Sequence, residues 1–146
     1  MEARIVRLKK IHEKLKAHEF RFDMQTMSGD YFYLFDALID ELFVCVREAF
    51  NGDPARMAGV TSLAHDARNS IGICKTYAEI GKLNNKYYDH FLHLEHVVGV
   101  IHRFIDAGVF DEIWCLSPES NNNPVTRLIF SEALRKWEPV KAFVPA

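Results

Sequence analysis

Hydrophobic positions recur along this chain with a period near 3.6 residues, which is the pattern of amphipathic helices. In the first helical stretch, the apolar stripe is formed by Ile5, Leu8, Ile11 and Leu15. No long run alternates polar and apolar residues, as the strands of a half-exposed sheet would. The pattern therefore predicts an all-α protein, with long helices at residues 2–20, 30–50, 61–80 and 87–107.

Glycine, proline and capping residues set the expected ends of these helices. Asp53 can cap a helix and Pro54 suits its first position, so this pair predicts a new helix after a break. Gly59 and Gly72 each cost about 1 kcal/mol relative to alanine inside a helix. We therefore expect a short helix after Pro54 and then a separate longer one, and we expect Gly108 to end the last long helix.

The last part of the chain predicts one more helix. The segment VFDEIWCL (109–116) is compatible with a short helical turn, and Asn123 followed by Pro124 is typical of a helix start. The expected architecture is an antiparallel four-helix bundle with an additional C-terminal helix. In this single domain, 1–146, the core bundle is 1–116, the linker loop is 117–124, and the C-terminal helix and tail are 125–146.

Length and composition fit one globular domain outside the membrane. The chain has 146 residues, of which 49% are hydrophobic. Its three cysteines are far apart and lack metal-binding spacing, which is typical of a reducing compartment. The N-terminal segment is charged throughout, so we expect no signal peptide, and no apolar stretch approaches the roughly 20 residues that span a bilayer. We expect a cytoplasmic protein with no membrane partner.

The net charge of −2 argues against a chain that is a polycation throughout, but the charge is unevenly spread. Residues 1–21 carry seven basic and three acidic side chains, whereas residues 22–53 carry seven acidic ones and one basic. The two segments could attract one another or a symmetry mate, or the basic helix could bind RNA or a partner. We interpret Asp36, Asp40 and Glu41 as a solvated face, complemented by Arg47 and by the basic N-terminal helix.

Four of the seven histidines fall between residues 90 and 102. At 100° per residue, His90 points into the apolar face of its helix, His93 lies at the edge, His96 faces solvent, and His102 lies on the other flank. The four therefore do not form one cluster. Glu-x-x-His, the spacing of bundle metal sites, is absent. His93 and His96 are weak candidates for an exposed metal, and we expect no metal or other cofactor.

The segment LNNKYYDHF (83–91) resembles the motif of the HEPN superfamily of small helical bundles. Members carry Arg, a polar residue, a few more residues and then His, at the start of a late helix. In one branch, associated with abortive infection, the motif often reads RNKYYAH. Asn84 and His90 are separated by five residues as in that motif, and residues 31–50 are similar to the aromatic-led second helix of the branch. The resemblance covers residues 31–105.

In active HEPN ribonucleases, the Arg holds the scissile phosphate and the His acts on the 2′-hydroxyl or the leaving oxygen. Two protomers bring their motifs together, and no metal is needed. Here Asn84 stands in the Arg position, and an amide donates hydrogen bonds without the charge that stabilises a phosphorane. The resemblance implies His90 as a general base, with Asn84, Asn85, Lys86 or Tyr88 assisting it.

The resemblance therefore predicts a non-catalytic or weakly catalytic HEPN-like domain, because the charged clamp is missing. We expect a homodimer that contacts protein or RNA in prokaryotic defence or in a toxin–antitoxin-like system, without a small-molecule cofactor. One alternative is a metal-independent endoribonuclease with His90 as its base. The other is a metal-binding helical bundle that uses His93 and His96 with a ligand from another helix.

Overall fold

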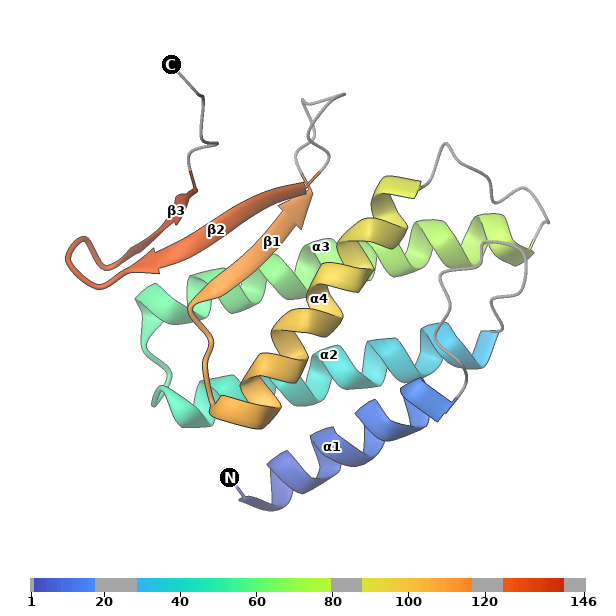
Figure 1. Ribbon diagram of the computed structural model, residues 1–146, viewed down its shortest axis with the longest axis horizontal. Coiled ribbons are helices and arrows are strands. Elements are labelled where there is room, and N and C mark those ends of the chain that lie inside the picture. Colours follow the sequence, from blue (N-terminus) through green and yellow to red (C-terminus); the bar gives the residue numbers. More distant parts are fainter. Residues whose placement is uncertain (1, 18–28, 80–87, 117–124, 141–146) are drawn as a thin grey trace.

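The computed structural model describes residues 2–17, 29–79, 88–116 and 125–140 (Figure 1). Four helices are followed by three strands. The elements are α1 (Glu2–Ala17), α2 (Gly29–Ala49), α3 (Pro54–Glu79), α4 (Tyr88–Ala107), β1 (Glu112–Leu116), β2 (Val125–Ser131) and β3 (Lys136–Pro139). The four long helices that the periodicity predicts are thus present, with one change in α3.

Each helix packs on the next one in the sequence, and α4 runs obliquely across α3 (Figure 1). The apolar stripe of each helix turns inward and forms one continuous core. Fully buried members include Leu8 and Leu15 of α1, Phe35 and Leu38 of α2, Leu63 and Ala67 of α3, and Leu94 and Ile101 of α4. In the described residues, no helix is long and apolar enough to cross a membrane.

Helix α3 is continuous from Pro54, so the prediction of a short helix and a separate one is wrong. The Oδ1 atom of Asp53 accepts a hydrogen bond of 3.2 Å from the backbone N–H of Ala55, as a helix cap does. Gly59 lies inside the helix because a side chain there would collide with Trp137. A Cβ atom at Gly59 would stand 2.2 Å from Cε2 of that indole. Gly72, by contrast, faces open space.

The C-terminal part forms a sheet, so the prediction of an all-α bundle with an additional C-terminal helix is wrong. The order is β1–β2–β3, and both pairs are antiparallel, with Ile113 opposite Leu128 and Phe130 opposite Trp137. Strand β1 packs on α3 and α4, where Phe110 and Ile113 join the core. The expected helical turn at 109–116 is mostly β1, and the expected linker at 117–124 lies outside the described residues.

Arg56, near the start of α3, contacts both the helices and the sheet. Its guanidinium lies 4.8 Å from the ring centre of Phe50 and 4.3 Å from that of Phe130, and it pairs with Glu132 of the β2–β3 turn. The indole N–H of Trp137 donates a hydrogen bond of 3.3 Å to the backbone oxygen of Arg56. The sheet therefore packs on the N-terminal part of α3, and α2 and α4 pack on other sides of the same helix.

Helix α1 is attached to α2 partly by charge. Arg4 Nε lies 2.6 Å from Glu48 Oε1, and Arg7 Nε lies 2.9 Å from Glu41 Oε1. The predicted attraction between the basic and acidic segments is confirmed for these two pairs. Arg4 and Glu48 are both exposed, so their pair contributes no more than about 1 kcal/mol to stability. Glu41 is only 12% exposed, so the Arg7–Glu41 pair lies partly inside the protein.

Candidate functional site

A chain of hydrogen bonds joins α3, α4 and β1 through Ser70 and two histidines. Ser70 Oγ lies 3.0 Å from Nδ1 of His93 and 3.3 Å from Nδ1 of His90. His93 Nε2 lies 2.8 Å from the backbone oxygen of Trp114. Because a carbonyl only accepts, the Nε2 atom carries the proton, and in the neutral ring Nδ1 accepts from the Ser70 hydroxyl. Ser70 Oγ can then accept a hydrogen bond from His90.

Burial keeps His93 in this neutral form. Desolvation lowers the pKa of His93, and the hydrogen bond to Trp114 opposes the effect only in part. The side chain is fully buried and the Ser70 hydroxyl is buried with it, so the hydroxyl cannot reach a dissolved substrate as a nucleophile. The pair Ser70 and His93 therefore fixes the packing of α3, α4 and β1.

The predicted placement of the histidines on α4 is wrong for His93 and His96, whereas His90 turns toward the buried Ser70, as its predicted position on the apolar face implies. His93 lies in the core, while His90 is half-buried, and His96 is also half-buried instead of facing solvent. The cause is β1, which covers a side of α4 that a bundle without a sheet would leave open. There His96 stacks on Trp114 with 4.1 Å between ring centres, and burial lowers the pKa of His96.

A metal shared by His93 and His96 has no support in this geometry. Both ring nitrogens of His93 are hydrogen-bonded, so neither is available as a ligand. Among the described residues, no group of three or more His, Cys, Asp or Glu side chains could hold a metal ion.

Most of the HEPN-like motif falls outside the described residues. Asn84, Asn85 and Lys86 precede α4, and Tyr88 begins the helix but its side chain is not described. His90 is the motif residue whose surroundings are visible, and it is next to Ser70. How the motif residues lie relative to one another therefore stays a prediction.

The cysteines do not offer a reactive thiol. Burial raises the pKa of Cys45 to about 11 and the pKa values of Cys74 and Cys115 to about 12. Asp66 adds to the shift at Cys115 by repulsion and a hydrogen bond. At neutral pH all three thiols are protonated, which argues against a cysteine nucleophile among them.

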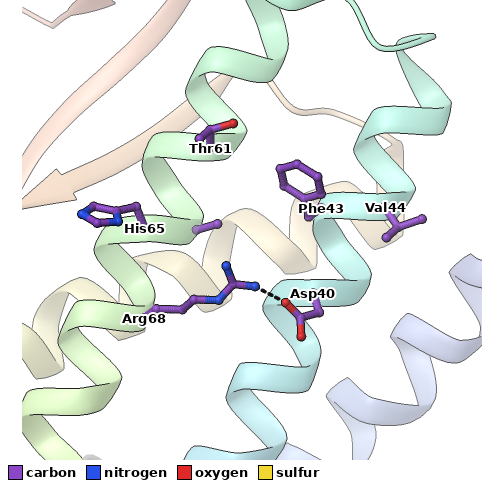
Figure 2. Close-up of a pocket in the computed structure, with 7 residues that line it drawn as sticks. Asp40, Phe43, Val44, Thr61, His65 and Arg68 are labelled. Carbon is purple, nitrogen blue, oxygen red and sulfur yellow. Dashed lines mark hydrogen bonds and ion pairs between the residues drawn. The ribbon is translucent and has the colours of Figure 1, made fainter.

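An exposed groove lies between α2 and α3, and Arg68 lines both of its hollows. Figure 2 shows the larger hollow, with Thr61 at one end and Arg68 at the other. Arg68 reaches across from α3 to Asp40 on α2, with which it forms a hydrogen-bonded ion pair. Its Nε atom also lies 3.6 Å from Asp36 Oδ1. These three side chains are each about half exposed, so the ion pairs are in contact with solvent.

Two hollows flank Arg68 along the groove. One has a volume of about 480 Å³ and is lined by Asp40, Phe43, Val44, Thr61, Ala64, His65 and Arg68. The other has about 280 Å³ and is lined by Phe32, Tyr33, Asp36, Arg68, Ile71, Gly72 and Lys75. Apolar surface predominates in the first hollow and charged side chains surround it, as is common where another molecule binds.

The sequence interpretation missed the groove and assigned a different partner to its carboxylates. The sequence predicts that Asp36, Asp40 and Glu41 form a solvated face complemented by Arg47 and the basic N-terminal helix. Glu41 does pair with Arg7 of that helix but is mostly buried, whereas the observed partner of Asp36 and Asp40 is Arg68. A signal was present in α3, where Thr61, His65, Arg68, Gly72 and Lys75 follow the spacing of a single helix stripe. That stripe is polar or small throughout, so it does not resemble a core-facing one.

Neither a protein-family model, nor a curated protein, nor a solved structure matches this chain.

Proposed function

We propose that this chain is a cytoplasmic, HEPN-like domain that acts by dimerisation and by contacts with protein or RNA. It is non-catalytic or only weakly catalytic, and it serves in prokaryotic defence or in a toxin–antitoxin-like system. The HEPN-like part of the proposal rests on the motif around Asn84 and His90. The region of resemblance, 31–105, includes most of α2, all of α3 and most of α4, and it excludes the sheet.

The α2–α3 groove is the observation that carries the binding role. It exposes apolar hollows and charged side chains to solvent over much of two helices. On another side of α3, by contrast, Ser70 is buried and is hydrogen-bonded to the buried His93 of α4. A surface built this way favours association over chemistry, because its ion pairs contribute little to folding and can be shared with a partner.

The test of weak or absent catalysis is an RNA cleavage assay with a chelator present. Purified protein at micromolar concentration is incubated with end-labelled RNA of mixed sequence, with and without EDTA. We expect intact RNA, because Asn84 cannot supply the charge that stabilises the transition state. Rapid cleavage that persists in EDTA and copurifies with the protein would overturn the non-catalytic assignment.

One observation favours a metal-independent ribonuclease as the second candidate. Ser70 Oγ lies 3.3 Å from His90 Nδ1, and a third group that orients the imidazole is a common feature of general bases. If this candidate is correct, His90→Ala abolishes cleavage and EDTA does not. His102→Ala is the matched control, since His102 is exposed on α4 and pairs with Asp106. Equal cleavage by both variants and the wild type would exclude His90 as the base.

A further inference from the structure

The two helices that form the groove present stripes of opposite charge. On α2, the stripe beside the groove carries Asp36 and Asp40. On α3, the facing stripe carries Arg68 and Lys75. A surface with an acidic stripe beside a basic stripe is complementary to a copy of itself. The copy must be rotated so that its acidic stripe faces the basic stripe of the first molecule.

The charged residues of the two stripes lie at matching positions along the helix axes. Arg68 contacts both Asp36 and Asp40, so it lies level with the middle of that pair. Helix α3 runs antiparallel to α2 (Figure 1), and Tyr33 shares its hollow with Gly72 and Lys75. A two-fold axis parallel to the groove places α2 of one copy over α3 of the other, with each residue at the same position along the groove.

Under that rotation, the acidic pair, Val44 and Tyr33 of α2 each lie opposite a feature of the partner's α3. Asp36 and Asp40 of one copy face the partner's Arg68, and Val44 faces the larger hollow beside the partner's Thr61. Tyr33 of one copy lies over the partner's Gly72, where the absence of a side chain leaves space. Tyr33 is 79% exposed in the single chain, which is unusual for a large aromatic side chain outside an interface.

We propose that the α2–α3 groove is the interface of a two-fold homodimer, in which the acidic α2 stripe of each copy packs on the basic α3 stripe of the other. Tyr33 inserts over Gly72 of the partner subunit on both sides of the axis. The inference rests on the proposed function, to which it adds the interface and the occupant of the groove.

The first experiment measures solution mass by light scattering over a dilution series, for the wild type and two variants. Tyr33→Ala removes the exposed ring, and we expect it to raise the dimer Kd at least about tenfold. Leu134→Ala is the matched control, because Leu134 is also exposed, at 59%, but lies on the β2–β3 turn and lines neither hollow of the groove. It should leave the Kd unchanged.

A charge exchange tests the geometry directly. Asp36→Lys/Asp40→Lys makes both stripes basic, and Arg68→Glu/Lys75→Glu makes both acidic. Each variant alone should be monomeric, because like charges then face each other across the axis. An equimolar mixture should recover the dimer mass, since basic stripes then meet acidic ones. Circular dichroism of each variant verifies folding, and the half-exposed positions make misfolding a small risk.

The outcomes separate this inference from the wider proposal. Loss of dimer in each variant with recovery in the mixture supports the interface. If the wild type is a dimer and none of these substitutions changes the dimer Kd, the proposed interface is wrong, although the protein still dimerises. A wild type that stays monomeric across micromolar concentrations overturns both the interface and the dimerising function, and the groove would then serve a different partner chain.

Discussion

Helix α3 carries buried polar residues on one side and solvent-exposed polar residues on the other. Arg68 and Ser70 are two residues apart and so about 200° apart around the helix. Ser70 is fully buried and bonded to His93, while Arg68 is about half exposed and pairs with Asp36 and Asp40. The first arrangement holds the fold together, because a buried polar group without its partner is costly. The second contributes little to the fold and remains available for association.

The largest effect is expected from His93→Ala. The substitution leaves the Ser70 hydroxyl and the Trp114 carbonyl without this partner and opens a cavity in the core. We expect the unfolding free energy to fall by about 3 kcal/mol, measured by urea denaturation. The matched control is His65→Ala on the groove side, where the side chain is exposed and the change should stay within about 0.5 kcal/mol. Equal losses in the two variants would contradict the comparison.

Glycine-to-alanine substitutions also compare the side of α3 that packs on the sheet with the side that lines the groove. Gly59→Ala forces a methyl group against Trp137 and should cost about 2 kcal/mol while changing the tryptophan fluorescence. Gly72→Ala meets nothing within 4 Å and should stabilise the monomer by up to about 1 kcal/mol, because alanine favours helix. A Gly59→Ala protein as stable as the wild type would show that the sheet does not dock on α3 as described.

Acid should lower the unfolding free energy through the buried histidines. Burial lowers the pKa of His93, and burial together with Lys16 and His102 lowers the pKa of His12. Both folded pKa values lie below 6.5, so the unfolded chain binds protons first as the pH falls below that value. The unfolding free energy should therefore be highest above pH 6.5 and should decrease toward pH 5, by at most about 1.4 kcal/mol per pH unit for each histidine.

Urea denaturation between pH 7.5 and pH 5 measures this dependence. His93→Gln keeps a donor and an acceptor but does not titrate, so its stability should vary less with pH than that of the wild type. An unchanged pH dependence in His93→Gln would show that protonation of His93 is not a cause of the acid destabilisation.

The smallest effect on stability is expected on the groove side. Arg68→Ala removes ion pairs that are half exposed, so the unfolding free energy of the dilute protein should change by less than about 1 kcal/mol. The same substitution should weaken self-association in light scattering, because it removes the charge that faces the partner's carboxylates. A variant that loses more than about 2 kcal/mol of stability, with no change in mass, would make Arg68 a folding residue.

The helices were predictable because local signals determine them. Asp53 caps α3 as expected, and Gly108 ends α4 with a φ of 66°, a conformation that glycine adopts without strain. The sheet was not predictable from periodicity, because its strands are only five, seven and four residues long and are defined by pairing with one another. The lack of room for a side chain at Gly59 is set by Trp137, which is 78 residues further along the chain, so no local pattern could predict it.

The site was predictable only in part, for a related reason. Helical spacing places Asp36 and Asp40 on one side of α2, but it does not say which helix lies opposite, so Arg68 was missed. The burial of His93 depends on β1, which the sequence interpretation took for a helical turn. His90 was singled out from the motif, whereas its contact with Ser70 depends on how α3 and α4 cross.

The most direct test of the groove as a self-association surface is the mass of the charge-exchanged mixture. Asp36→Lys/Asp40→Lys and Arg68→Glu/Lys75→Glu are each measured alone by light scattering and then together at equal concentration. We expect two monomers that form a heterodimer when they are mixed. Variants that each remain dimeric alone, or a mixture that remains monomeric while the wild type is a dimer, would contradict it.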